Sequence, residues 1–340
     1  MKMIIQKGKK SSLWKKFVIG ISYTLILLIA IGTIYEAIAG YFGERKFSPE
    51  GKLVEVGDYN LHLHKQGDSG PTIILEAGSA ASSASWGNIP KELTKYATVV
   101  TYDRGGYAWS DKAATERTGK NIVKELYTAL KKEGIEGPYI LVGHSLGGMY
   151  TRLFAQTYGG EVAGLVLLDS RPEDFTKKAD PIFQEVGLDP VFAGLPSKNL
   201  LSLMKVTGIL RLMAELGVTD LPKGQIDQMI NIELRPKAFQ AKEDELKNMN
   251  QLEKDIRLMS LGDLPLSIVT HGIPIDSTPF GLTQEQSDQI EEIWQEQQKE
   301  LLKLSTNSKL IIAKDSSHLV MNDEPELVIE VVKNMIEEVN

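Results

Sequence analysis

Eight short apolar runs, each four to six residues long, constrain the fold of this 340-residue chain more than any other feature. A run of this length is typical of a buried strand, and helical patterns separate many of the runs. Alternation of strands and helices is the pattern of a mostly parallel sheet with helices on both faces. We therefore expect one α/β domain over residues 50–340. The predicted strands are 53–56, 61–65, 72–76, 98–102, 139–142, 164–168, 266–271 and 309–313.

The strand pattern stops between residues 171 and 264, where a stretch rich in Leu, Met and Phe follows the sixth strand. We expect this stretch to be a helical cap inserted into the domain. Its apolar side chains either form a small core of their own or make the underside of a lid over a pocket for lipophilic groups. Elsewhere, apolar residues at every fourth position predict an amphipathic helix over 117–133, and Pro325 opens a last helix.

Two features of the composition limit the chemistry. The chain has no cysteine, which excludes disulfides, thiolate zinc sites and cysteine nucleophiles, so a nucleophile has to be an oxygen or an amine. The charge is unevenly divided. Residues 1–49 hold eight Lys and Arg against two Glu, whereas the remainder holds 30 Lys and Arg against 43 Asp and Glu. A body this acidic lacks the basic face of a nucleic-acid-binding protein, so we expect no nucleic-acid partner.

The N-terminal segment carries the signals of a membrane anchor. Residues 17–35 run for 19 positions without a charge, close to the roughly 20 that a helix needs to cross a bilayer. Six lysines and no acidic residue precede this run. By the positive-inside rule, we expect a transmembrane helix over about 17–39, a cytoplasmic N-terminus and an extracytoplasmic domain after about Tyr41. The predicted location is the cell membrane, with a single pass.

A cleavable signal peptide is the alternative interpretation of the same segment. Ala37-Ile38-Ala39 is a small-x-small tripeptide just beyond the apolar run, and cleavage near Ala39 would release a secreted protein. However, the run is longer than the apolar core of a signal peptide, which has about 7 to 15 residues. Glu36 also interrupts the approach to the tripeptide. These two features favour a retained anchor and leave cleavage as the alternative.

A five-residue motif joins the fifth predicted strand to a helix. In Gly143-His144-Ser145-Leu146-Gly147 the serine lies at the junction, and the helix starts near Leu146. A turn this sharp requires glycines two residues before and two residues after the serine, where a Cβ would clash. The turn lifts the hydroxyl above the sheet edge, at the positive end of the helix. We therefore predict that Ser145 is a catalytic nucleophile and that His144 packs rather than reacts.

A serine nucleophile needs a base to accept its proton, and the chain has five histidines. His318 follows the last predicted strand and precedes the closing helix, which is the place of the base in the chain order serine, acid, histidine. We predict that His318 is this base. His62 and His64 lie on one face of an early strand and are expected to be surface or packing residues. Asp103 is expected to be a structural carboxylate paired with Arg104.

Three segments of the chain resemble the α/β-hydrolase family. Residues 99–111 look like its fourth-strand turn, 143–148 like its nucleophile turn and 317–325 like its histidine loop. The resemblance extends over about residues 53–339, with the helical cap inserted after the sixth strand. It implies an α/β-hydrolase fold and a Ser-His-acid triad that works without a metal or an organic cofactor. It does not imply a substrate, because the fold hosts esterases, lipases, peptidases, C–C bond hydrolases, lactonases and cofactor-free haloperoxidases.

The same resemblance implies the remaining parts of the site. The backbone N–H groups of Leu146 and Ser79 would form the oxyanion hole, although the family commonly has His-Gly where this chain has Ala77-Gly78. The acid that orients the histidine usually follows the seventh strand, which indicates Asp276. In some members it follows the sixth strand, which indicates Asp169. Both aspartates are candidates.

Together these features predict a serine hydrolase that cleaves an ester or related acyl bond of a small, lipophilic substrate through an acyl-enzyme intermediate. Epoxide hydrolase and haloalkane dehalogenase activities are disfavoured because those relatives use a carboxylate nucleophile, whereas position 145 is serine. C–C bond hydrolysis or perhydrolysis by the same triad is one alternative. A membrane-tethered binding or sensor protein without turnover is another. No obligate protein partner is indicated.

Overall fold

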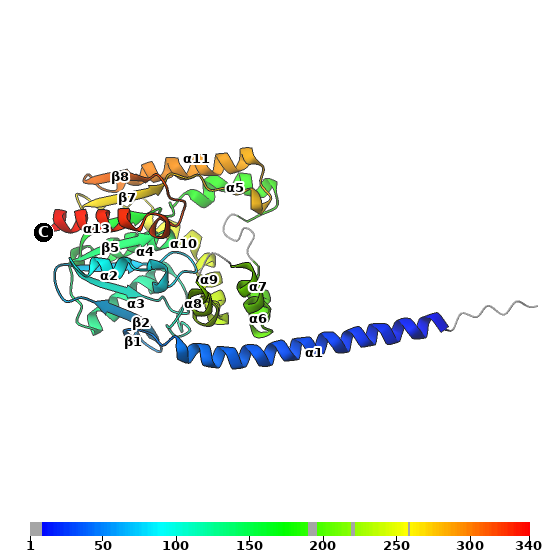
Figure 1. Cartoon of the computed structure of the whole chain (residues 1–340). Helices are drawn as coiled ribbons and strands as arrows, with labels where there is room; N and C mark the ends of the chain where they lie inside the picture. Colours follow the sequence, from blue (N-terminus) through cyan, green and yellow to red (C-terminus); the bar gives the residue numbers. More distant parts are fainter. Residues whose placement is uncertain (1–8, 190–195, 219–221, 258) are drawn as a thin grey trace, which may run out of the picture. The chain divides into compact units, whose positions relative to one another are not determined.

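The computed structural model describes residues 9–189, 196–218, 222–257 and 259–340 (Figure 1). The first eight residues, with Lys2 and Lys7 of the predicted basic tail, lie outside the described part. The chain forms two compact units. The N-terminal unit comprises Met1–Ser48 and Ser197–Pro236, and the sheet unit comprises Pro49–Pro196 and Lys237–Asn340. Residues 197–236, which fall inside the predicted cap, thus group with the N-terminal helix.

One eight-stranded sheet organises the sheet unit. Its strands are β1 (Lys52–Glu55), β2 (Asn60–Gln66), β3 (Thr72–Glu76), β4 (Thr98–Tyr102), β5 (Tyr139–His144), β6 (Val162–Leu168), β7 (Leu266–His271) and β8 (Ser308–Ala313). Their order is β1-β2-β4-β3-β5-β6-β7-β8. The pairs β1–β2 and β2–β4 are antiparallel, and the other neighbouring pairs are parallel. The predicted eight strands and the mostly parallel sheet are confirmed.

Helices cover both faces of this sheet (Figure 1). Those on one face are α3 (Gly119–Lys132), α4 (Leu146–Thr157) and α10 (Met249–Ile256), and those on the other are α2 (Ile89–Leu93) and α13 (Pro325–Val339). Because side chains alternate along a strand, Ile74 of β3 joins the first core while Ile73 and Leu75 join the second. The central strand β5 is buried along its whole length, which explains its unbroken apolar run.

The remaining α-helices of the sheet unit come from three parts of the chain. The predicted insertion supplies α5 (Phe175–Glu185) and α9 (Pro236–Lys247) in addition to α10. The segment between β7 and β8 forms α11 (Gln284–Glu300), which begins with a capping box between Thr283 and Gln286. The sequence analysis did not identify α11, because its residues are mostly polar and show no clear apolar stripe. A short helix, α12 (Val320–Asp323), precedes α13.

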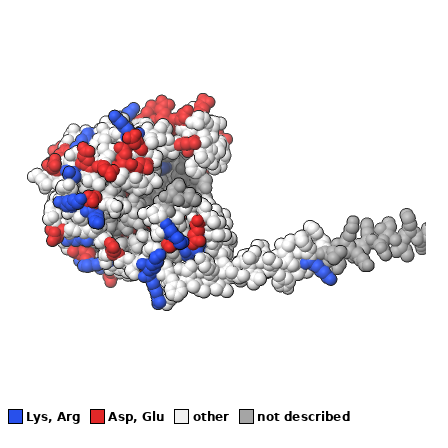
Figure 2. All heavy atoms as spheres, viewed as in Figure 1, with Lys and Arg blue, Asp and Glu red and all other residues white. Residues whose placement is uncertain are grey.

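The described part of the N-terminal unit consists of helices joined by short turns and contains no strand. It contains α1 (Lys9–Lys46), α6 (Lys198–Val206), α7 (Ile209–Gly217), α8 (Lys223–Gln228) and a π-helical turn, η3 (Met229–Glu233). Of the described helices, α1 is the one long and apolar enough to cross a membrane. Figure 2 shows the middle of this helix without a charged side chain and Lys or Arg toward its amino-terminal end, and Arg45 and Lys46 lie in its last turn. This helix is a candidate transmembrane segment.

Candidate active site

Ser145 lies in a strained turn between β5 and α4. Its backbone has φ 51° and ψ −121°, a region that residues with a Cβ rarely adopt. Neighbouring atoms leave no room for larger residues beside it. A Cβ on Gly143 would lie 2.7 Å from the Gly147 carbonyl oxygen, and one on Gly147 would lie 2.6 Å from the Ala77 carbonyl oxygen. The two glycines therefore allow the turn that holds the Ser145 hydroxyl at the carboxyl edge of the sheet.

His318 reaches Ser145 from the loop after β8. Its Nε2 lies 3.0 Å from the Ser145 Oγ, and its Nδ1 lies 2.6 Å from Asp169 Oδ2. An ionised carboxylate can only accept hydrogen bonds, so Nδ1 carries the proton in this arrangement. Nε2 is then free to accept the hydrogen of the serine hydroxyl. The structure thus brings Ser145 and His318 together in the geometry of a nucleophile and its base.

Asp169 follows β6 and is completely buried. Its backbone, like that of Ser145, has positive φ (40°), and its N–H donates to the Val269 carbonyl of the neighbouring strand (2.6 Å). The carboxylate accepts from His318, from His271 (2.7 Å) and from the indole N–H of Trp294 (3.0 Å). Burial alone would raise the pKa of this carboxyl. The hydrogen bonds from the two histidines outweigh burial and hold the pKa of Asp169 well below its usual range.

Asp276, the other candidate acid, lies elsewhere. It is exposed, and its carboxylate accepts from the backbone N–H of Thr278 at 2.9 Å, as in a local turn. Among the hydrogen bonds of the described residues, none joins Asp276 to His318. The structure therefore brings one of the two predicted aspartates, Asp169, to the histidine and leaves the other in a solvent-exposed loop.

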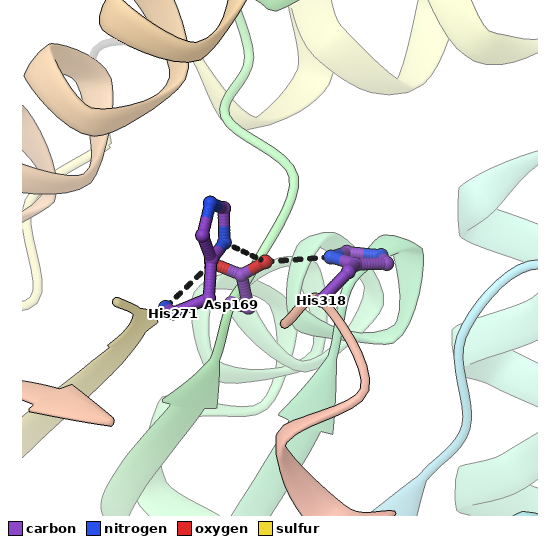
Figure 3. Close-up of side chains that lie close together, drawn as sticks. All are labelled: Asp169, His271 and His318. Carbon is purple, nitrogen blue, oxygen red and sulfur yellow. Dashed lines mark hydrogen bonds and ion pairs between the residues drawn. The ribbon is translucent and has the colours of Figure 1, made fainter. Parts of the chain in front are cut away.

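His271 is part of this cluster, although the sequence analysis assigned it no role. It is buried at the carboxyl end of β7, and its Nδ1 lies 2.7 Å from Asp169 (Figure 3). Its Nε2 lies 2.8 Å from Glu291 of α11. Burial lowers the pKa of this imidazole. Hydrogen bonds to the two carboxylates outweigh burial and raise the pKa of His271 to about 9. The side chain is therefore a buried cation at neutral pH, and it balances part of the charge of Asp169 and Glu291.

The pH dependence of stability should report on this cation. The folded pKa of His271 lies above its ordinary value of about 6.5, so its contribution is fully present below that pH and is lost as the pH rises through about 9. Between about pH 6 and pH 10, the free energy of unfolding should fall by roughly 3 kcal/mol more for the wild type than for His271→Gln. Urea unfolding across this range measures the difference. Parallel pH profiles for the two proteins would contradict the assignment.

Asp169, His271 and His318 also meet the simplest requirement for a metal site, since their potential ligand atoms lie within 4.8 Å of one another. However, Nδ1 of each histidine already lies 2.6–2.7 Å from the same carboxylate oxygen. Two ligands of a tetrahedral zinc ion would be separated by about 3.3 Å. The spacing is that of hydrogen bonds, so in this arrangement both histidines donate to the Asp169 carboxylate.

The loop after β3 lies beside Ser145, as the predicted oxyanion hole requires. A Cβ on Gly78 would lie 3.3 Å from the Ser145 Cβ. Arg104 donates to the carbonyl oxygens of Ala77 and Gly78, both at 2.7 Å. In a trans peptide the N–H points opposite to the C=O, so the Ser79 N–H is directed away from Arg104. Leu146 starts α4, and its N–H has no acceptor within that helix. Neither N–H donates to a backbone acceptor outside the helices and strands of the described residues, and the oxyanion hole stays a prediction.

Arg104 itself is buried and is held by two carboxylates. It lies 2.6 Å from Glu76 and 2.9 Å from Glu245 of α9. The predicted pairing of Asp103 with Arg104 is wrong. Asp103 instead lies 2.8 Å from His62 Nδ1. The physical reason is that consecutive residues leaving a strand point to opposite faces, so these neighbours reach different partners.

Arg104→Met should destabilise the sheet unit strongly. The substitution leaves the carboxylates of Glu76 and Glu245 buried without their cation, and the free energy of unfolding should fall by roughly 3–5 kcal/mol. Urea unfolding followed by circular dichroism measures this change. Lys95→Met, which removes a cation from an exposed ion pair with Glu92, is the matched control and should unfold like the wild type. Equal stability of the two variants would refute the expected role of Arg104.

His144 packs as predicted. It is buried, and its Nε2 lies 2.8 Å from the His318 carbonyl oxygen. Burial lowers its pKa to about 4, so the ring is neutral at pH 7 and Nε2–H donates this hydrogen bond. His144 therefore fixes the backbone of the loop that carries His318.

Known proteins share this architecture. A family described as alpha/beta hydrolase fold matches residues 71–206. The uncharacterized protein YqjL of Bacillus subtilis is 28% identical and covers 78% of this chain and 83% of its own length. The Cif epoxide hydrolase of Acinetobacter nosocomialis has a TM-score of 0.67 at 15% identity, covering 90% of this chain and 96% of its own. A thermophilic esterase from Thermogutta terrifontis has a TM-score of 0.58 at 17% identity, covering 86% and 99%. At these identities the solved structures establish the fold alone.

Proposed function

We propose that this chain, which is a member of the α/β-hydrolase fold family, is a serine hydrolase that cleaves an ester or related acyl bond of a small, lipophilic substrate. One observation carries the proposal. Ser145, His318 and Asp169 form a continuous hydrogen-bonded array with distances of 3.0 and 2.6 Å, built beyond the carboxyl ends of the parallel strands β5, β8 and β6. A protein that only binds a ligand has no need of this array.

The array supports acyl transfer in two steps. His318 Nε2 takes the proton of the Ser145 hydroxyl as the oxygen attacks the substrate carbonyl carbon. The backbone N–H groups of Leu146 and Ser79 stabilise the resulting oxyanion. The His318 imidazolium then protonates the leaving alcohol, and an acyl-enzyme remains. Water, deprotonated by His318, releases the acid. Asp169 stays ionised throughout and holds His318 in the required tautomer.

The similarity to epoxide hydrolases does not extend to this chemistry. Opening an epoxide through a covalent ester requires a carboxylate nucleophile, because the ester has to be hydrolysed in the second step. A serine at position 145 would form an ether, which water does not cleave under these conditions. The Ser145 side chain therefore supports esterase chemistry among the activities named for proteins of this fold.

A panel of p-nitrophenyl esters with acyl chains of increasing length tests the proposed reaction. We expect turnover with a burst of p-nitrophenol equal to the amount of enzyme wherever deacylation is slower than acylation. We also expect a preference for medium or long chains over acetate. Lack of turnover with every ester, in a protein whose Ser145 still reacts with a fluorophosphonate, would refute ester hydrolysis and leave C–C bond hydrolysis or perhydrolysis.

The proposal includes a retained membrane anchor at α1, with a cytoplasmic N-terminus and the catalytic unit outside the cell membrane. Contacts inside the N-terminal unit support retention. Glu36 lies 2.6 Å from Lys205 and 2.5 Å from Arg211, and all three are buried. Cleavage near Ala39 would remove Glu36 and leave two buried cations without their carboxylate, at a cost of roughly 3–5 kcal/mol. Measurement of the intact mass of the protein from the membrane fraction tests whether the anchor is retained. A mass that corresponds to a chain starting after Ala39 would refute retention.

A further inference from the structure

The α6–α7 hairpin of the N-terminal unit exposes apolar side chains and buries charged ones, which is the opposite of a helix pair in a soluble protein. On α7, Ile209, Leu212, Met213 and Leu216 follow the i, i+3, i+4, i+7 spacing of one helix face, yet all four are 45–72% exposed. On α6, Leu200, Leu203 and Val206 are exposed in the same way. The charged Lys205 and Arg211 are buried instead. An outward apolar stripe of this size is expected to meet another apolar phase.

This hairpin packs against the end of the uncharged run of α1. The turn at Thr207 and Gly208 comes so close that a Cβ on Gly32 would overlap the Thr207 carbonyl oxygen. Gly32 lies three residues before Tyr35, the last residue of the run, which is about 5 Å along the helix axis. An amphipathic helix in a membrane interface buries its apolar face to a depth of about 5–10 Å. The tip of the hairpin therefore lies at the level of an interfacial helix if α1 spans the bilayer.

Among the charged side chains of α1 that follow its uncharged run, the first is buried and the later ones are exposed. Glu36, the first charged residue after the run, is withdrawn from the surface by its ion pairs with the two hairpin cations. Two ion pairs whose member on α1 is exposed lie two to three helical turns farther along this helix, between Glu44 and Arg235 (3.3 Å) and between Lys46 and Asp227 (3.3 Å). The surface of the unit thus changes from uncharged to charged along one helix, as at the edge of a bilayer.

We propose that the α6–α7 hairpin lies in the lipid interface beside α1, and that the partner of its apolar stripe is the bilayer in which α1 is anchored. Ile31 and Ile34, on either side of Gly32, are themselves exposed, so helix and hairpin present apolar surface at the same level. The inference rests on the proposed anchoring of α1 but not on the catalytic residues. The bilayer then holds part of the inserted segment 171–264 as well as the N-terminal helix.

Single-cysteine labelling tests this directly, because the chain has no cysteine of its own. Leu203→Cys and Leu212→Cys place a bimane fluorophore on the hairpin of the full-length protein. Leu27→Cys places it in the middle of the uncharged run and reports on anchoring. Ile312→Cys, at a position 56% exposed on β8, is the aqueous control. Each labelled protein is reconstituted into phosphatidylcholine vesicles with and without nitroxide-labelled acyl chains, and iodide serves as the aqueous quencher.

We expect nitroxide lipid to quench the labels at positions 203 and 212 at least about half as strongly as the label at 27. Iodide should quench them at least about threefold less than the label at 312. Adding Leu216→Asp to the Leu212→Cys protein should weaken the quenching of the label by nitroxide lipid and strengthen its quenching by iodide. The reason is that a charge in the stripe opposes insertion into the interface. Far-UV circular dichroism and thermal unfolding, compared with the wild type, verify that each variant is folded.

Two results would overturn the inference. Labels at 203 and 212 that respond to iodide like the label at 312, while the label at 27 responds to nitroxide lipid, would show an anchored protein whose hairpin lies in water. Labels shielded from both quenchers would show that protein, from this chain or another copy, covers the stripe. If the label at 27 also fails to respond to nitroxide lipid, the proposed anchor itself is refuted.

Discussion

Ser145→Ala should lower kcat/KM for ester substrates by at least about 10⁴-fold and abolish labelling by a fluorophosphonate probe. The substitution removes the Oγ that lies 3.0 Å from His318 Nε2, and no acyl-enzyme can form without it. Backbone donors at Leu146 and Ser79 remain, so a small residual rate above that of water is expected. Steady-state kinetics and gel detection of the probe measure the two effects.

Ser79→Ala is the matched control for this experiment. Like Ser145→Ala, it removes a serine hydroxyl, here from a residue beside the nucleophile. It keeps the backbone N–H that is proposed to bind the oxyanion. Labelling and turnover should therefore stay close to the wild type. Equal labelling of Ser145→Ala and wild type would refute the nucleophile, whereas the loss of activity in Ser79→Ala alone would assign a role to that hydroxyl.

Asp169→Asn should lower kcat by roughly 10⁴-fold, whereas Asp276→Asn should change it less than about twofold. The asparagine NH₂ group cannot accept from His318 Nδ1–H, so the imidazole is free to take the wrong tautomer or to rotate. Asp276 is exposed and accepts from Thr278, so the same substitution there leaves the array intact. The opposite ranking of the two variants would identify Asp276 as the acid and refute the proposed triad.

A structural loss has to be separated from a catalytic one, because Asp169 also accepts from buried His271 and Trp294. Thermal unfolding of Asp169→Asn and of His271→Gln provides this separation. Both variants should be destabilised, since each leaves a buried polar group without its partner. The large fall in kcat is expected for Asp169→Asn, because that variant loses the group that orients His318. A fall of the same size in His271→Gln would show that the histidine pair acts as a unit.

Local patterns in the sequence were sufficient for the sheet and for the first two members of the proposed triad. Strand length and the alternation with helices depend on residues close in the chain, and the eight strands were found at their predicted places. The glycines around Ser145 reflect a turn whose steric limits are also local. The position of His318 followed from chain order. Its contact with Ser145 required the parallel register of the strands between them.

The choice between Asp169 and Asp276 as the partner of His318 was beyond local reasoning, because both aspartates follow strands at the same sheet edge. The backbone turn at Asp169 and the donors from β7 and α11 decide which carboxylate is held beside His318. His271 was already visible at the end of a predicted strand, and its place beside β6 is the signal that could have assigned it. Trp294 had no such signal, since it lies on a helix with little apolar periodicity.

For the N-terminal segment, too, some features follow from the local sequence and others only from the tertiary structure. Its sequence alone determined an uncharged helix long enough to cross a bilayer, because length and hydropathy are local properties. Only the tertiary structure decided the partners of Glu36. Lys205 and Arg211 are far away in the chain and lie on helices whose exposed apolar stripe the sequence could equally assign to a core. Which face of an amphipathic helix is buried depends on what packs against it, and that is set by the fold.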